Sequence, residues 1–276
     1  MKHIFKRIVP APLRPLLKNA YYGIVDPIEV LLGLRNPLVP PRRLLFVGPG
    51  DFQKIGEEFF GYFVDRGGLK PSDSVLDVGC GVGRMAVPLT RYLREGRYEG
   101  IDIVSEGIEW CRKNITPRFP NFRFQRADVQ NDHYNPHGKW KASEYRFPFE
   151  SASFDFVFLT SVFTHMLPKD LENYLAEIAR VLKSGGRCMI TYFLLTQDSL
   201  RAIEEGRSTQ NFRHRGKGYR TVNPDDPESS VAYELEAIRA LYSSLGLVIR
   251  EPVHEGSWYG RKDYLTYQDL IVAEKG

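Results

Sequence analysis

The stretch Ser74-Val-Leu-Asp-Val-Gly-Cys-Gly-Val-Gly-Arg84 decides the fold. Its first residues are apolar, as in a buried strand, and the strand ends in Asp77 followed by three alternating glycines. Gly79, Gly81 and Gly83 lack a Cβ, so they can adopt positive φ angles and let the main chain approach a ligand closely. We expect a helix to begin near the last residue of the stretch, where free N–H groups favour an anionic group. Asp77 could bind an ammonium group, so the acid and the loop together suit a zwitterionic amino-acid tail.

Three further strands are predicted downstream. Residues 98–103 form an apolar strand ending in Asp102, and residues 122–129 alternate apolar and polar side chains and end in Asp128. Residues 154–160 are almost continuously apolar, which is typical of a central strand covered on both faces. Because these strands alternate with helical patterns, the sequence predicts a parallel sheet with right-handed crossovers.

Helices and the remaining strands follow from periodicity and from start and stop signals. The predicted helices are 53–65, with Asp51 as N-cap and Gly67-Gly68 as the stop, 85–92, 106–114, 171–182, closed by Ser184-Gly-Gly186, and 231–245. The predicted later strands are 187–195, 247–253 and 268–273.

Residues 75–84 resemble the first motif of class I methyltransferases that use S-adenosylmethionine, and the resemblance extends from about residue 68 to residue 193. The G-x-G-x-G spacing differs from the G-x-G-x-x-G of dinucleotide-binding folds. The resemblance implies an α/β fold with a Rossmann-like, doubly wound, mostly parallel seven-stranded sheet. It also implies that residues 247–253 and 268–273 form an antiparallel hairpin at one edge.

The same resemblance assigns the cofactor, S-adenosylmethionine, to particular residues. Asp102 would accept hydrogen bonds from both ribose hydroxyls, and Asp128 would bind the adenine amino group. The full set of cofactor-binding residues implied is Asp77, Gly79, Cys80, Gly81, Gly83, Arg84, Asp102, Ile103, Asp128, Val129, Leu159 and Thr160. Each acid taken alone could equally be a helix N-cap or a turn residue, so the prediction depends on the four strands occurring in register.

Methyl transfer is an in-line displacement, so positioning and exclusion of water supply much of the catalysis. An oxygen acceptor also benefits from a base, and histidine suits neutral pH. The leading candidate is His165, which could instead only shape the pocket. The candidates that follow are His254, Tyr192 and His133.

The acceptor can be narrowed by the residues after the fourth strand. Amide and exocyclic-amine methyltransferases often carry an Asn/Asp-Pro-Pro-Tyr/Phe sequence there, whereas this chain has Leu159-Thr-Ser-Val162. That difference favours a carbon or oxygen acceptor on a small molecule, most of all an oxygen nucleophile of a sugar, lipid or natural product. The competing hypotheses are a non-catalytic cofactor-binding or partner module and an NAD-dependent oxidoreductase.

Three long connections should border the acceptor: residues 130–149, 196–230 and 254–267. The second is expected to act as a lid. Its basic residues could recognise an acidic acceptor, although a solvated charge run is an equally good interpretation. They are Arg207, Arg213, His214, Arg215, Lys217 and Arg220.

Composition sets the remaining expectations. The chain has 276 residues, 42% of them hydrophobic, which predicts one enlarged domain at 46–276 behind an extension at 1–45. Three cysteines without a C-x-x-C or Cys/His cluster argue for a reducing compartment and against a metal site. With no long apolar run and no leader pattern, we expect a cytoplasmic protein. Oligomeric state cannot be inferred.

The extension differs in charge from the rest of the chain. It holds eight basic and two acidic residues, a net charge of +6. Because the whole chain has a net charge of +4, the remainder carries −2, which gives little support for nucleic-acid binding. Prolines 10, 12 and 15 divide it and are expected to prevent a long helix. An arm packed on the domain or on a second subunit is favoured over an amphipathic segment on the inner membrane surface.

Overall fold

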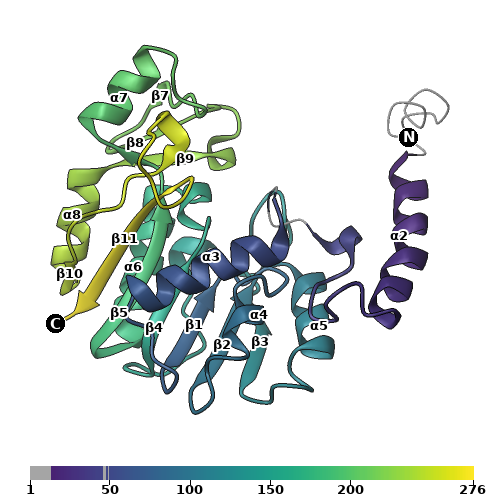
Figure 1. Ribbon diagram of the computed structural model, residues 1–276. Helices are drawn as coiled ribbons and strands as arrows, with labels where there is room; N and C mark the ends of the chain where they lie inside the picture. Colours follow the sequence, from purple (N-terminus) through teal and green to yellow (C-terminus); the bar gives the residue numbers. More distant parts are fainter. Residues whose placement is uncertain (1–13, 46–47, 49) are drawn as a thin grey trace.

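A seven-stranded sheet forms the centre of the computed structural model, which describes residues 14–45, 48 and 50–276 (Figure 1). Its strands are β1 (Ser74–Val78), β2 (Arg97–Asp102), β3 (Phe122–Arg126), β4 (Phe154–Leu159), β5 (Leu182–Tyr192), β10 (Leu247–Ile249) and β11 (Asp269–Lys275). They lie in the order β10-β11-β5-β4-β1-β2-β3. Strands β1 to β5 pair in parallel, and β11 pairs antiparallel with both β5 and β10. The predicted sheet and its antiparallel C-terminal pair are confirmed.

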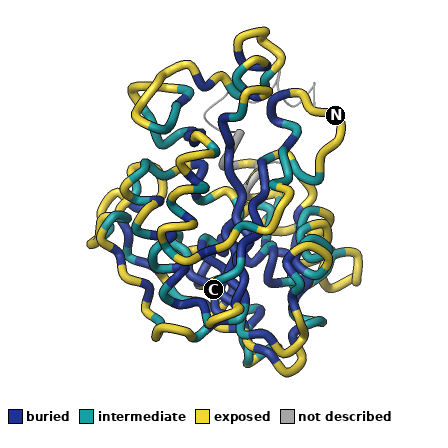
Figure 2. The backbone as a smooth tube through the Cα atoms, turned by 90° about the vertical axis from the view of Figure 1, so that its left-hand side faces the viewer, coloured by how far each residue is buried: buried dark blue, intermediate teal, exposed yellow. Residues whose placement is uncertain are grey.

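Helices cover both faces of this sheet, because successive strand side chains point to opposite faces. They are α3 (Phe52–Asp65), α4 (Ala86–Leu89), α5 (Ser105–Asn114), α6 (Pro168–Val181) and α8 (Leu235–Ser244). In β1, Val75 packs in a cluster with residues of α3, α4 and α5, while Leu76 packs in one with residues of α6 and α8. Both clusters are fully buried, and the tube coloured by burial shows this interior as a continuous dark-blue centre (Figure 2).

Three predicted helices have different bounds. The helix after the glycine loop is only the four residues of α4, because Gly83 (φ 78°) prevents an earlier start and the Thr90 hydroxyl caps the Val87 carbonyl at 2.6 Å. Helix α6 ends at Val181, and residues 184–186 lie within β5. Residues 231–234 are a strand rather than the start of α8. The N-cap prediction for α3 is confirmed, since Asp51 accepts a 2.8 Å bond from the Lys54 N–H.

The predicted lid connection carries secondary structure of its own. It contributes to a second sheet of order β6-β9-β8-β7, made of β6 (Leu194–Leu195), β7 (His214–Arg215), β8 (Tyr219–Thr221) and β9 (Val231–Glu234). Helix α7 (Gln197–Glu204) and the 3-10 helices η5 (Pro227–Ser229) and η6 (Ser257–Tyr259) complete this unit, which we call the lid. Phe193, Phe212 and Trp258 form its aromatic core.

Asp269 at the start of β11 ties the lid to the main sheet. Its Oδ2 accepts hydrogen bonds from the backbone N–H of Leu194, at 2.6 Å, and from Trp258 Nε1, at 2.8 Å. Its Oδ1 accepts a 2.6 Å bond from the N–H of Gly256. Burial raises the pKa of Asp269 to about 7, although these three donors act in the opposite direction.

The N-terminal part forms a helix that the sequence did not predict. Helix α2 (Arg14–Leu31) runs for 18 residues and stands beside the sheet domain, beyond α5 (Figure 1). The expectation that prolines prevent a long helix is wrong for these residues, because Pro15 lies in the first turn, where no intrahelical N–H bond is lost. Pro27 lies inside the helix. The predictions for prolines 10 and 12 lie outside the described residues. Among the described helices, none has the length and apolar character needed to cross a membrane.

Candidate functional site

The glycine loop after β1 has the backbone that the sequence predicts. Gly79, Gly81 and Gly83 have φ angles of 85°, 55° and 78°. A Cβ on Gly79 would lie 2.4 Å from Val162 Cγ2, so the loop passes directly against the segment that follows β4. The N–H groups of Gly79 and Cys80 both donate to the Ile101 carbonyl, at 2.8 and 3.1 Å. The loop is therefore held at the carboxyl ends of β1, β2 and β4.

Asp77 lies beneath this loop and is 1% exposed. The Tyr98 hydroxyl donates a 2.5 Å hydrogen bond to its Oδ2, while Oδ1 is buried with no hydrogen-bond partner among the described residues. Burial, with a smaller contribution from Asp102, raises the pKa of Asp77 to about 8. A buried acid with one unsatisfied oxygen is suited to a cationic ligand.

The two other predicted acids differ in environment. Asp102 accepts a 2.7 Å bond from the Gly81 N–H on one oxygen and a 2.8 Å bond from the Val104 N–H on the other, so it fixes the glycine loop to β2. Burial raises its pKa against these donors. Asp128 is far more open, and its nearest polar groups are Asn135 Nδ2 at 3.4 Å and Arg126 Nη2 at 3.5 Å.

The remaining predicted cofactor residues follow the same strand edge. The Cys80 and Leu159 side chains are buried, and burial raises the pKa of the Cys80 thiol, so Cys80 packs against the loop rather than acting as a thiolate. Val129 is buried, and Ile103 and Thr160 are half-buried. Arg84 is half-buried with its guanidinium 6.0 Å from the Phe52 ring centre, and burial lowers its pKa.

The structure fits S-adenosylmethionine on two counts. The unsatisfied Asp77 oxygen suits an ammonium group. Asp102, at the end of β2, accepts the Gly81 N–H on one oxygen and the Val104 N–H on the other, and a carboxylate has further acceptor positions beyond these. Together these features place charge and hydrogen-bond acceptors where an adenosine and an amino-acid group would lie.

Ser161 lies in the segment that directly follows β4. It is a non-glycine residue in the left-handed region, with φ 61°. Its N–H donates to Thr191 Oγ1 at 2.8 Å, and its hydroxyl donates to Gln268 Oε1 at 3.0 Å. These bonds from β5 and from the residue before β11 hold the strained turn. No sequence signal identified Gln268, because its role comes from the antiparallel return of β11.

His165 ends the 3-10 helix η4 (Phe163–His165), directly after this turn. The side chain is exposed, and its Nδ1 lies 3.0 Å from the Glu228 carbonyl oxygen of the lid. A carbonyl oxygen only accepts, so Nδ1 carries the proton and Nε2 of the neutral ring keeps its lone pair. The lid thus sets the tautomer that a base requires.

The other catalytic candidates lie elsewhere. Tyr192 is fully buried in the core and its hydroxyl pairs with that of Tyr242 at 2.8 Å, so the structure does not support its selection as a catalytic group. His254 pairs by its backbone with Leu270, and burial together with Arg66 lowers its pKa. His133 Nε2 lies 3.1 Å from Asp226 Oδ1, so the 130–149 insertion touches the lid there.

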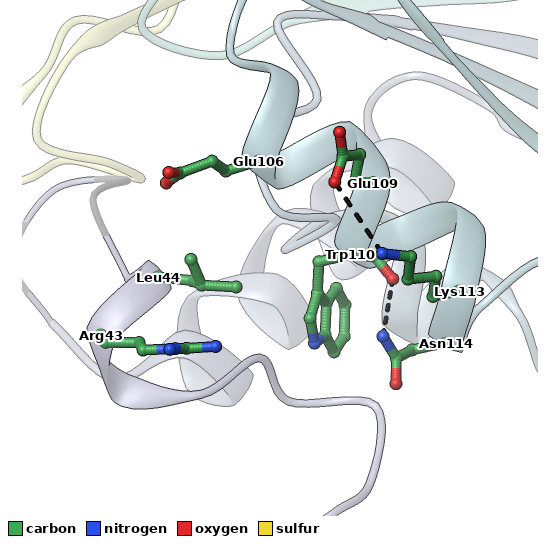
Figure 3. A pocket seen from close by; sticks show the side chains of 7 residues that line it. All are labelled: Arg43, Leu44, Glu106, Glu109, Trp110, Lys113 and Asn114. Atoms are coloured by element: carbon green, nitrogen blue, oxygen red, sulfur yellow. Dashed lines mark hydrogen bonds and ion pairs between the residues drawn. The ribbon is translucent and has the colours of Figure 1, made fainter. Parts of the chain in front are cut away.

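A separate cavity of about 470 Å³ lies between α5 and the 3-10 helix η2 (Arg42–Leu44) (Figure 3). Arg43 and Leu44 face Trp110 across it, and the α5 side carries Glu109 paired with Lys113 at 3.9 Å. The lining of this cavity carries both charges, with Arg43 and Lys113 beside Glu106 and Glu109.

Comparisons with known proteins agree with this geometry. A family model described as "Methyltransferase domain" matches residues 76–190. Phthiotriol/phenolphthiotriol dimycocerosates methyltransferase of Mycobacterium tuberculosis is 37% identical over 123 residues, 45% of this chain and 37% of that protein. Fatty-acid O-methyltransferase of Mycolicibacterium smegmatis is 34% identical over 122 residues, 44% of this chain and 36% of that protein. The chain thus spans well under half of the length of these relatives.

A solved structure shows the same fold. PH0226 protein from Pyrococcus horikoshii superposes with a TM-score of 0.56 at 18% identity, covering 84% of this chain and 95% of that one. The matched segment runs from β1 into β5 and contains the glycine loop, Asp102 and Asp128. Residues 76–190 of this chain therefore match the family described as a methyltransferase domain, on a fold that the solved structure shares.

Proposed function

We propose that this protein transfers a methyl group from S-adenosylmethionine to an oxygen atom of a lipid-like small molecule. The observation that carries the proposal is the 3.0 Å contact between His165 Nδ1 and the Glu228 carbonyl, which leaves Nε2 as a proton acceptor at the edge where the glycine loop lies. One relative is named as a fatty-acid O-methyltransferase, and this supports the choice of oxygen and of a lipid. Another, the sterol 24-C-methyltransferase erg6 of Schizosaccharomyces pombe, is 30% identical over 146 residues and is named for a carbon acceptor.

The chain's own groups would perform three tasks. Asp77, Asp102 and the glycine loop hold the donor, and when bound S-adenosylmethionine supplies an electrophilic methyl group on a positively charged sulfur. The Ser161 turn, fixed by Thr191 and Gln268, sets the wall of the cleft between the donor and the acceptor.

His165 would act on the acceptor. His165 would hold the acceptor hydroxyl, and Nε2 would take the hydroxyl proton as the oxygen becomes methylated by the bound donor. The Nδ1–H bond to the lid carbonyl persists and stabilises the imidazolium that results. For a carboxylic acid acceptor that is already ionised, His165 would only position the oxygen.

The lid and the 130–149 insertion would cover this cleft. The Tyr233 hydroxyl donates to the Met166 carbonyl, and His133 meets Asp226, so both segments contact the residues around η4 or each other. Water exclusion of this kind favours nucleophilic attack on a methyl group over hydrolysis.

The test uses S-adenosylmethionine with a deuterated methyl group and three acceptor classes: a long-chain fatty acid, a long-chain alcohol and a sterol. Mass spectrometry of the products identifies the labelled atom. Label on oxygen of the acid or the alcohol supports the proposal. Label on sterol carbon, or donor binding without product from any acceptor, contradicts it.

A further inference from the structure

Helix α2 presents a continuous apolar face to solvent. Leu17, Tyr21, Ile24, Ile28 and Leu31 recur at the three- and four-residue spacing that places side chains on one face of a helix. They are 47% to 86% exposed. Among the described residues, eight of the fourteen exposed large apolar side chains lie between positions 17 and 34. Single exposed apolar residues are ordinary, but a stripe of this length indicates a surface that binds a protein or a membrane.

The opposite face of α2 is already occupied. Asp26 is buried and forms an ion pair with Arg42, whose N–H also donates to Asp26 Oδ2 at 2.7 Å. Arg42 further contacts Glu29 at 2.8 Å and stacks 5.2 Å from the centre of the Tyr22 ring. These contacts fix the apolar face outward. The cavity between η2 and α5 separates this assembly from the sheet domain, so the domain does not cover the face (Figures 1 and 3).

We propose that this face docks on an anionic lipid surface. The first 18 residues of the sequence contain Lys2, Lys6, Arg7, Arg14 and Lys18 and no acidic residue. The two acids of α2 are paired within the protein, Asp26 with Arg35 and Arg42 and Glu29 with Arg42. A helix with an apolar face, next to a stretch whose sequence is basic, is suited to the interface of a membrane that carries negative headgroups.

The charges disfavour a second copy of the chain as the occupant. A parallel pair of α2 helices would bring the basic N-terminal ends together. An antiparallel pair would bring the basic end of one helix to the C-terminal half of the other, where Asp26 and Glu29 are already paired and the exposed Arg43 follows. Both arrangements place like charges side by side, and their repulsion costs free energy. An anionic surface would attract the same charges.

The test is sedimentation of the full chain with vesicles of phosphatidylcholine alone and of equal parts phosphatidylcholine and phosphatidylglycerol. Binding should be at least about tenfold stronger to the mixed vesicles and should weaken as salt is raised. A variant with Leu17→Gln, Ile24→Gln and Ile28→Gln should lose this binding. Val248→Gln, which changes an apolar side chain 65% exposed on β10, is the matched control and should retain it.

Two further measurements make the result decisive. Calorimetry with S-adenosylmethionine on each variant shows that the fold is intact, and since sedimentation needs no turnover, the outcome is independent of the proposed function. Equal binding by the triple variant and the unmodified chain, or absence of binding to mixed vesicles, overturns the proposal. A dimer of the unmodified chain in lipid-free solution that the triple variant abolishes also overturns it, because a second copy would then be the occupant.

Discussion

The Tyr98 hydroxyl donates a 2.5 Å hydrogen bond to Asp77 Oδ2, and both side chains are buried beneath the glycine loop. This bond stabilises the carboxylate form, whereas burial favours the protonated form and prevails, with a pKa of about 8. The charge of Asp77 therefore depends on whether a cation lies beside it.

The first prediction is that donor binding strengthens as pH rises. Below the Asp77 pKa of about 8 the free protein binds a proton that a cationic ligand must displace, so the dissociation constant for S-adenosylmethionine should fall by up to about tenfold per pH unit from pH 6 to 8 and then level off. Calorimetry at several pH values measures this. Asp77→Asn should bind weakly with a flat profile, and Tyr98→Phe should shift the levelling point upward. A pH-independent constant for the unmodified chain would contradict the assignment.

Glycine substitutions separate the cofactor loop from an ordinary turn. Gly79→Ala would place a Cβ 2.4 Å from Val162 Cγ2 and should weaken donor binding by at least about tenfold by moving the loop. Gly185→Ala is the matched control, because its φ of 71° is similar but the space around it is open. Both variants should lose about 1 kcal/mol of stability from backbone strain. Only Gly79→Ala should change the dissociation constant for S-adenosylmethionine. Equal changes in both variants would refute a role of the Gly79 position in holding the cofactor loop.

Removing the imidazole tests the base. His165→Ala should lower turnover on an alcohol acceptor by about 10² to 10⁴-fold, because the proton then has no positioned acceptor. Donor affinity should not change, since His165 is not among the residues expected to bind the donor. Added imidazole should restore part of the rate. Undiminished turnover would exclude His165 from proton transfer.

Asp269 provides a test of the lid's attachment. In Asp269→Asn an amide group would face the N–H donors of Leu194 and Trp258, which should lower the free energy of unfolding by about 2 kcal/mol in urea titrations. Asp225→Asn, at an exposed position, is the control. Because the pKa of Asp269 is raised to about 7, its contribution to stability should decline from about pH 4 to about pH 7 and then stay constant. A variant with the same stability and pH profile as the unmodified chain would contradict this role.

The basic hairpin of the lid predicts a preference among acceptors. Arg215 in β7 lies opposite Arg220 in β8, and their proximity together with burial lowers the pKa of Arg220. Replacing Arg213 and Arg215 by Glu should raise the Michaelis constant for a fatty acid severalfold while leaving that for a long-chain alcohol almost unchanged. Reversing the distant, exposed Arg94 and Arg118 should affect neither constant. An equal rise in the Michaelis constant for a fatty acid from both pairs of substitutions would contradict recognition by the hairpin, because it would reflect only the change in net charge.

The sheet was predictable because its signals are local. Strands β1 and β4 are short apolar runs, β3 alternates apolar and polar side chains, and the acids at 77, 102 and 128 lie at or near the ends of β1, β2 and β3. The lid was harder to predict, since β9 at residues 231–234 pairs with β6 and β8, and such distant pairing leaves no pattern in the segment itself. The residues of β9 instead match the helical spacing of apolar side chains that continues into α8.

The site residues show the same limit. Tyr192 lies at the end of a strand and could have faced the cleft, but its partner Tyr242 comes from α8, fifty residues later, and turns it into the core. Ser161 acquires its left-handed backbone from Thr191 and Gln268, which only the folded sheet brings near. The boundaries predicted for the domain and its insertions, and the roles of the site residues, remain predictions.

The lid draws its core from three separate parts of the chain. Phe193 and Leu195 come from the end of β5 and from β6, Phe212 comes from the 196–230 connection, and Trp258 comes from the connection between β10 and β11. Excision of residues 196–230 would therefore leave two aromatic rings uncovered at the sheet edge rather than yield a trimmed catalytic body. Transplanting acceptor preference from this protein to a relative would require moving all three parts together, with the carboxylate of Asp269 that fastens them.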